Sequence, residues 1–352
     1  MTTFAALYVP APLRAAVSDD AWLAAMLEAE RAVATVTGAD VSDDVFRPEL
    51  YDMAALSDEG RADTNPVVPL ARALRERAPN AHAPATSQDI LDTAAMLVAR
   101  NARTLILAEL DGAAGACAGL AEAHRSTVMA GRTLLRRARP ITFGVTAAGW
   151  LFELVAARRR LAATTLPAQL GGAVGTLAPD LAARFTAELG LDAEVIPWHV
   201  HRAPMAELAS ALDAVGAACA KIGLDVVLLA QNEIGELSER DSGGSSSMPH
   251  KRNPAAAVLA RACARLAHAN ASVLAGGEHE LQRAAGAWQA EWPALSAALA
   301  FAGGASAAVR RSLEGLQVHA DRMAAKAAEM DGDIGAAEAV VDRALAYYGE
   351  QE

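Results

Sequence analysis

Apolar residues recur at alternating spacings of three and four along one segment in the second half of the chain. The series is Met205, Leu208, Leu212, Val215, Cys219, Ile222, Val226 and Leu229. Such a heptad stripe is typical of a long helix that packs against other helices. It predicts a helix from Pro204 to about Glu236, roughly 45–50 Å long at 1.5 Å per residue. We expect so long a stripe to be buried against other subunits as well as against its own chain.

Three further long helices are predicted from apolar spacing and from helix-start signals. One begins at 86–89, where Thr86 and Asp89 resemble a capping box, and continues towards His124. Another follows the segment 140–144, and a fourth follows Pro254. No segment indicates a β-strand of any length. The pattern therefore predicts an all-α fold, an elongated helical bundle.

The distribution of prolines and charges suggests a division into three parts. Prolines interrupt residues 1–85, which predicts shorter helices in a small N-terminal helical domain. Residues 86–305 form the central long-helix bundle in this interpretation. Residues 306–352 are predicted to form a short, charged C-terminal helical tail.

Composition narrows the class of protein. Of the 352 residues, 53% are hydrophobic but only 4% are aromatic, which favours packed helices over a β-sandwich. A net charge of −11 disfavours a nucleic-acid partner. The chain shows no signal peptide and no uncharged apolar run of about 18 residues, so we expect a cytoplasmic protein without membrane spans. The isolated cysteines Cys117, Cys219 and Cys263 are expected to be buried free thiols.

The most informative polar segment is Gly243–Pro254, which reads GGSSSMPHKRNP. Its glycines allow the loop to bend, its serines can move protons, and Lys251 and Arg252 bring positive charge. Asn253 is a good N-cap, and Pro254 suits the first turn of the helix that follows. Because a helix start favours anions, this serine loop predicts a carboxylate-binding site beside a proton-transfer group.

Four other polar motifs interrupt the predicted helices. They span residues 65–69, 82–89, 131–140 and 231–236. Capping and turn chemistry would explain any one of them alone. All four lie at helix ends, so together with the serine loop they favour a site that several helices of a bundle build jointly.

Residues 244–254 resemble the signature of the fumarase/aspartase superfamily, and 86–89 and 131–133 resemble its other two active-site regions in the expected order. Within it, the chain is most similar to the 3-carboxy-cis,cis-muconate cycloisomerases. That likeness rests on MAGRT at 129–133, GGAVGTLA at 171–178, PWH at 197–199 and RAAGAWQAEW at 283–292. The resemblance covers most of residues 50–340 and implies a homotetramer whose active sites are shared between subunits.

The resemblance also implies roles for individual residues. Ser245 matches the serine that shuttles the proton on the carbon next to the carboxylate, and His82 matches a histidine near the substrate, so both are catalytic candidates. The implied substrate-binding residues are Thr86, Ser87, Arg132, Thr133, Gln231, Ser246, His250, Lys251 and Asn253. His250 either contacts substrate or only fixes the loop, and the residues do not decide between these.

The reaction implied for such a family member is a lactonisation. One carboxylate of 3-carboxy-cis,cis-muconate, a small tricarboxylate, adds across a C=C bond to give 4-carboxymuconolactone in the protocatechuate (β-ketoadipate) branch of aromatic degradation. The intermediate is an aci-carboxylate, which a cationic pocket would stabilise. The reaction needs no metal or organic cofactor. His199 and His201 could supply two metal ligands, but no third ligand lies at a suitable spacing.

Some positions depart from the family pattern. Leu134 stands where many superfamily lyases have a histidine; cycloisomerases also lack it and usually have a tryptophan there. Leu134 argues against argininosuccinate and adenylosuccinate lyases and leaves the second proton-transfer group unassigned. Pro84 and the segment 202–204 also depart, and the chain ends near the start of the family's third domain, so it resembles a short form with a truncated C-terminal domain. Two alternatives stay open, another superfamily lyase such as adenylosuccinate lyase or an inactive structural helical-bundle homologue.

Overall fold

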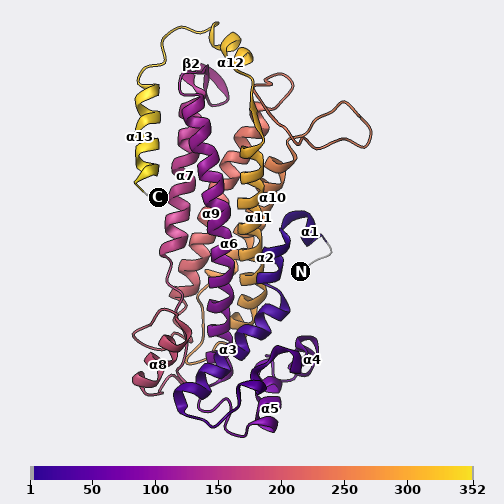
Figure 1. Ribbon diagram of the computed structural model, residues 1–352, viewed down its shortest axis with the longest axis vertical. Coiled ribbons are helices and arrows are strands. Elements are labelled where there is room, and N and C mark those ends of the chain that lie inside the picture. Colours follow the sequence, from indigo (N-terminus) through magenta and orange to yellow (C-terminus); the bar gives the residue numbers. More distant parts are fainter. Residues whose placement is uncertain (1–3, 351–352) are drawn as a thin grey trace. The chain divides into compact units, whose positions relative to one another are not determined.

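The computed structural model describes residues 4–350, and most of them are helical (Figure 1). The helices are α1 (Ala5–Tyr8), α2 (Ala11–Ala16), α3 (Asp19–Thr37), α4 (Met53–Glu59), α5 (Val67–Arg77), α6 (Ser87–Ala123), α7 (Phe143–Ala163), α8 (Pro179–Leu189), α9 (Ala203–Leu229), α10 (Ala255–Leu274), α11 (Ala287–Glu314), α12 (Ala320–Ala327) and α13 (Ala337–Gly349), with 3₁₀ turns η1 (Asp43–Phe46) and η2 (Pro48–Leu50). Short strands are β1 (Val128–Thr133), β2 (Arg136–Thr142), β3 (Leu237–Glu239) and β4 (Leu316–Val318). The predicted helical fold class is confirmed.

Helix α9 confirms the heptad prediction, and the whole apolar stripe from Met205 to Leu229 is buried. The helix ends at Leu229 rather than near Glu236. Gly235 takes the left-handed conformation, with φ +58°, and the Glu236 N–H donates back to the Leu229 carbonyl at 2.9 Å. This return bond closes the helix end and turns the chain into β3.

Helix α6 runs unbroken through Gly112, Gly115 and Gly119. At Gly112 a side chain would overlap the Arg310 guanidinium, so this glycine allows a close approach and does not end the helix. At the start of α6 the Thr86 N–H donates to the Asp89 carboxylate at 2.9 Å, as in the predicted capping box.

The prediction that the chain has no strands is wrong between α6 and α7. Strands β1 and β2 form an antiparallel hairpin that pairs Val128 with Thr142 and Thr133 with Arg136. Its two-residue turn is Leu134–Leu135, both with positive φ (50° and 61°). Hairpin turns of this kind usually carry Asn or Gly, so the Leu-Leu pair is not a recognisable turn signal.

Contacts divide the chain into two compact units. The first unit comprises Met1–Leu105, Thr164–Leu212 and His268–Ala300, and the second comprises Ile106–Ala163, Asp213–Ala267 and Phe301–Glu352. These units cut across the predicted divisions at residues 85 and 305, which stay a sequence-based prediction.

In the first unit, α3 packs against α8. Ser18 caps the start of α3 by accepting from the Ala21 N–H, and Gly38, with φ +68°, ends it. Between these signals α3 buries an apolar face that includes Met26 and Val33. The same face carries Glu30, a fully buried carboxylate.

In the second unit, α13 lies alongside α7, and α12 contacts the β1–β2 hairpin (Figure 1). The core of this unit holds Cys117, Cys219 and Cys263, which are buried and form no disulfide among residues 4–350, as predicted. Burial raises the pKa of all three thiols, so they are unreactive packing residues.

By length and hydropathy alone, α6 and α11 could each cross a membrane. Core helices of globular enzymes meet the same criteria. Here both helices carry buried charges, because Asp92 on α6 and Glu291 on α11 each form an ion pair with Arg202.

Candidate functional site

The two ends of the serine loop are hydrogen-bonded to each other, and most residues between them are exposed to solvent. The backbones of Gly243 and Asn253 exchange two hydrogen bonds of 2.8 and 2.9 Å. The Asn253 side chain adds a bond from Nδ2 to the Gly244 carbonyl at 3.0 Å. A nine-residue loop, 244–252, therefore projects from a fixed base.

The loop presents several predicted site residues to solvent. Ser246, His250 and Lys251 are exposed, and Ser245 is half-buried. The Ser245 hydroxyl accepts from the Met248 N–H at 3.2 Å, which holds its oxygen at the inner side of a tight turn. A backbone donor in this position stabilises negative charge on the serine oxygen.

The predicted N-cap of the helix that follows the loop is wrong. Asn253 does not cap α10, because its side chain donates to the loop instead. The cap is the buried Glu239, whose carboxylate accepts from the Ala256 and Ala257 N–H groups at 3.0 and 2.9 Å and from the Ser312 hydroxyl at 2.7 Å. The anion position at this helix start is therefore occupied by the protein's own carboxylate.

Arg132 and Gln231 line one cavity in the second unit. The cavity measures about 610 Å³ and is also lined by Trp150, Lys221 and Asp225. Trp150 donates from its indole nitrogen to Asp225 at 2.8 Å, and Gln231 donates to the Leu228 carbonyl at 2.8 Å. The cavity is thus lined by apolar and polar groups from α7, α9 and the β1–β2 hairpin.

The charge of Arg132 is already paired. Its guanidinium makes a bidentate contact with the fully buried Glu236, at 3.0 and 2.7 Å. Lys326 lies 4.0 Å from the same carboxylate. Thr133 is exposed at the end of β1, and Leu134, the position that departs from the family pattern, is 96% exposed at the hairpin turn.

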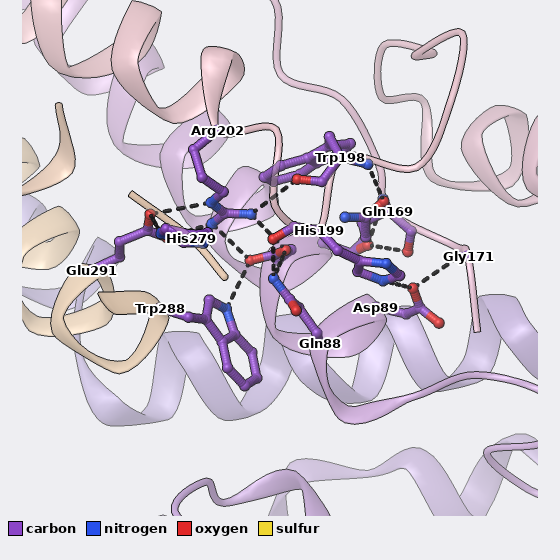
Figure 2. A network of polar contacts seen from close by, with 12 residues as sticks. Gln88, Asp89, Gln169, Gly171, Trp198, His199, Arg202, His279, Trp288 and Glu291 are labelled. Carbon is purple, nitrogen blue, oxygen red and sulfur yellow. Dashed lines mark hydrogen bonds and ion pairs between the residues drawn. The ribbon is translucent and has the colours of Figure 1, made fainter. Parts of the chain in front are cut away.

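In the first unit a buried polar network surrounds the start of α6 (Figure 2). Asp89 accepts from the Gly171 and Gly172 N–H groups at 2.8 and 2.9 Å and lies 2.8 Å from Nε2 of His199. Gly171 has no room for a side chain, because Pro197 and His199 fill the space beside it. The glycine-rich segment is therefore fixed against Asp89, close to the predicted residues Thr86 and Ser87 in sequence.

Arg202 is the buried centre of the same network (Figure 2). It pairs with Asp92 at 2.8 and 3.0 Å, contacts Glu291 with two nitrogens, and lies over the Trp198 ring at 4.6 Å from the centroid. Burial would lower the pKa of Arg202, but the two carboxylates outweigh burial and raise it. Trp288 donates to Asp92 at 3.0 Å. Trp288 and Glu291 thus help to hold the buried network together.

Sequence reasoning assigned no role to Arg283, which the structure places beside the start of α6. Its guanidinium donates to Oε1 of Gln88 and to the Ala173 carbonyl, each at 2.7 Å. Burial lowers the pKa of this half-buried arginine. Both acceptors are neutral, so its charge lacks a direct carboxylate partner among the described contacts. The separation of 195 residues from Gln88 left no local signal.

His82 also lies in the first unit, in the segment that precedes α6. Its Nδ1 is 2.7 Å from Oε1 of Glu30 on α3, and both side chains are buried. The predicted residues thus fall into two sets. His82, Thr86 and Ser87 belong to the first unit, whereas the serine loop, Arg132, Thr133 and Gln231 belong to the second.

Among residues 4–350 no three His, Cys, Asp or Glu side chains are arranged to hold a metal ion. His199 is bound to Asp89, and His201 is exposed. The two histidines weighed as metal ligands therefore have different surroundings, one buried and one exposed.

Comparisons with known proteins identify the family of this chain. The sequence model of the lyase family matches residues 61–267. A nitrosuccinate lyase of Streptomyces davaonensis is 44% identical over 360 residues, covering 92% of this chain and 76% of that protein. A 3-carboxy-cis,cis-muconate cycloisomerase of Bradyrhizobium diazoefficiens is 39% identical over 343 residues, covering 89% and 76%.

Solved structures that are similar to this chain come from the same family of enzymes. The 3-carboxy-cis,cis-muconate lactonizing enzyme of Pseudomonas putida matches with a TM-score of 0.86 at 30% identity, covering 99% of this chain and 88% of that one. A fumarate lyase of Mesorhizobium matches with a TM-score of 0.82 at 29% identity, covering 98% and 88%. The chain therefore belongs to the lyase family of the fumarase/aspartase superfamily, as an enzyme of that superfamily.

Proposed function

We propose that this enzyme makes or breaks a bond at the carbon β to a substrate carboxylate, with Ser245 carrying the proton on the α carbon. The observation that carries the proposal is the serine loop. In this loop the Ser245 oxygen accepts a hydrogen bond from a backbone N–H, and Lys251 and His250 are exposed to solvent between the tied ends. A serine hydroxyl is a poor base, so it needs such donors and nearby cations to act.

The cationic side chains near the predicted site differ in whether a carboxylate already pairs with them, which supports different roles for them. Arg132 is paired with Glu236, whereas Lys251 and Arg252 are exposed on the loop. We assign binding of the reacting carboxylate to the loop cations, which can stabilise the two negative charges of an aci-carboxylate. Thr86, Ser87 and Thr133 would donate hydroxyl hydrogen bonds to a second carboxylate, and Gln231 an amide one.

Two reactions of this kind are supported by relatives. On nitrosuccinate, loss of the proton next to one carboxylate and cleavage of the C–N bond at the next carbon would expel nitrite and leave fumarate. On 3-carboxy-cis,cis-muconate, a carboxylate oxygen would add to one alkene carbon while the neighbouring carbon takes up a proton, giving the lactone. The relatives are 44% and 39% identical, respectively, and Leu134 departs from the tryptophan expected of cycloisomerases. We therefore rank nitrite elimination first and lactonisation second.

We also propose that the active form is a homotetramer with shared sites. The hairpin turn exposes two large apolar side chains, Leu134 at 96% and Leu135 at 76%. Exposed apolar groups at one tip favour coverage by a partner. A second copy of the chain is the partner that the family resemblance implies.

A substrate panel tests the function. The purified full chain is incubated separately with nitrosuccinate, 3-carboxy-cis,cis-muconate and adenylosuccinate. We expect nitrite and fumarate from the first, or loss of the diene absorbance with the second. Fumarate from adenylosuccinate alone would overturn both assignments, and turnover of none at high enzyme concentration would favour an inactive homologue.

A further inference from the structure

Glu30 is a fully buried carboxylate that the proposed chemistry does not use. It lies on the buried face of α3, and its Oε1 is 2.7 Å from Nδ1 of His82. Its Oε2 is buried and has no hydrogen-bond partner among residues 4–350. Buried carboxylates with so few partners are costly, so the contact with His82 is the main compensation for this charge.

The backbone of His82 is also unusual. It adopts φ +73°, in the left-handed region that residues with a side chain seldom occupy. The Ala85 N–H donates to the His82 carbonyl at 2.8 Å, which closes a turn just before Thr86. A strained conformation of this kind persists only where the surroundings fix it, and such positions cluster at functional sites.

If the Glu30 carboxylate is ionised, it can only accept hydrogen bonds, and Nδ1 of His82 carries the hydrogen in their contact. Neutral His82 is then fixed as the Nδ1–H tautomer, whose Nε2 has a free lone pair. No group among residues 4–350 is recorded as bonding Nε2, and the His82 side chain keeps 7% exposure. The pair thus presents one ring nitrogen ready to take a proton.

We propose that Glu30 is a positioning residue that makes His82 the second proton-transfer group. That group is unassigned because Leu134 stands where many superfamily lyases have a histidine. Nε2 forms an N–H bond as a donor's X–H bond breaks, the donor being a substrate, a water or a serine hydroxyl. The negative charge of Glu30 stabilises the resulting imidazolium, and the reverse transfer regenerates the neutral ring. This inference rests on the proposed function for its catalytic consequence, although the state of His82 can be measured without any substrate.

The first experiment observes the tautomer directly. Full-length protein labelled with ¹⁵N-histidine is examined by long-range ¹H–¹⁵N correlation near neutral pH, and the spectrum of His82→Gln identifies the His82 signals. We expect the Nδ1–H pattern in the wild type and its loss in Glu30→Leu, which removes the acceptor of the Nδ1–H bond. The matched control is Glu28→Leu, because Glu28 lies on the same helix but pairs with Arg100. A wild-type Nε2–H pattern, or an unchanged pattern in Glu30→Leu, would overturn the inference.

The second experiment separates positioning from structural support. We expect Glu30→Gln to lower kcat by about 10²–10⁴-fold with little change in KM, while Glu28→Gln stays near the wild type. Combined with His82→Gln, the Glu30 change should have no additional effect, because it acts only through the ring.

A further loss in the double variant would show that Glu30 acts independently of His82, against the inference. If His82→Gln keeps full activity while Ser245→Ala is inactive, the proposed function stands and this inference fails. If the wild type turns over no substrate, the proposed function fails, and the tautomer measurement still decides whether Glu30 positions His82.

Discussion

At the scale of single residues, the strongest polar interactions are those that fix the scaffold rather than those that face a substrate. Arg202 joins Asp92 and Glu291, which come from α6 and α11, inside a buried network. Breaking a buried ion pair by removing one partner leaves the other charge uncompensated. The network therefore makes Arg202 the residue whose loss should harm folding most without touching the serine loop.

We predict that Arg202→Met lowers the free energy of unfolding by about 3–5 kcal/mol near neutral pH. Arg158→Met is the matched control, since it removes an arginine from a more exposed pair with Asp111 and should cost less than about 1 kcal/mol. Urea denaturation measures both. Equal stability of the two variants would contradict the role given to Arg202.

The pH dependence of this difference is also predictable. Burial raises the pKa of Glu291, but hydrogen bonds from His279 and Arg202 outweigh burial and lower it overall. A carboxyl group with a lowered pKa stabilises the folded state above its unfolded pKa, about 4.3, and loses that contribution as pH falls through its folded value. In Arg202→Met the part of this contribution that comes from Arg202 is absent, while the contact with His279 remains. The stability gap between the wild type and the variant should therefore narrow as pH falls below about 4.5, and a widening gap in denaturation at stepped pH would contradict this.

At this scale the sequence identified most polar positions but not their partners. Ser245, Lys251 and Asn253 stood out because they form one contiguous motif. The Glu30–His82 contact spans 52 residues and the Arg283–Gln88 contact spans 195, so neither leaves a local pattern. Pairing across such separations follows from tertiary packing alone.

At the scale of elements, the serine loop depends on how α10 begins. The loop base is tied by Gly243 and Asn253, and the adjoining helix start is tied by Glu239. A buried carboxylate that holds two helix N–H groups and a hydroxyl combines a cap with favourable placement at the positive end of the helix. Glu239 thus fixes the point from which the loop projects.

We expect Glu239→Ala to lower the free energy of unfolding by about 2–3 kcal/mol, because three charge-assisted hydrogen bonds are lost. It should also speed protease cleavage within 244–252. Glu314→Ala is the control, since Glu314 is half-exposed and pairs with Arg310 within the same helix. Unchanged stability together with an unchanged cleavage rate would show that the loop does not depend on this cap.

Helix positions followed from the sequence because apolar spacing extends over many turns in α6 and α9. The hairpin did not, since its strands carry arginines and its turn is Leu134–Leu135 instead of Asn-Gly. The sequence assigned the α10 cap to Asn253 because Glu239 lies 17 and 18 residues from the two amides it holds. Tertiary packing brings the Glu239 carboxylate to the first N–H groups of α10, where the sequence predicted the local Asn253 side chain.

At the scale of the whole molecule, the predicted site residues are divided between two compact units, and the proposed tetramer would combine them from different copies of the chain. His82, Thr86 and Ser87 lie in the first unit and the serine loop lies in the second. A site shared between subunits needs one segment from each of several copies. The sequence implied such sharing only through the family resemblance.

Subunit sharing predicts complementation. Inactive Ser245→Ala and inactive His82→Gln proteins, mixed, unfolded and refolded together, should regain activity up to about a quarter of the wild type, as mixed tetramers form sites with both residues intact. Sedimentation of the wild type checks the assembly. A monomer in solution, or mixtures as inactive as their components, would contradict shared sites.

The most direct test of the central claim is the turnover number of Ser245→Ala on the substrate that the wild type accepts. Ser247→Ala in the same loop is the control, and sedimentation checks that each variant assembles like the wild type. If Ser245 carries the α-carbon proton, turnover by Ser245→Ala should fall by about 10²–10⁴-fold or more, while Ser247→Ala stays within a few-fold of the wild type. Equal turnover by the two variants would contradict the account.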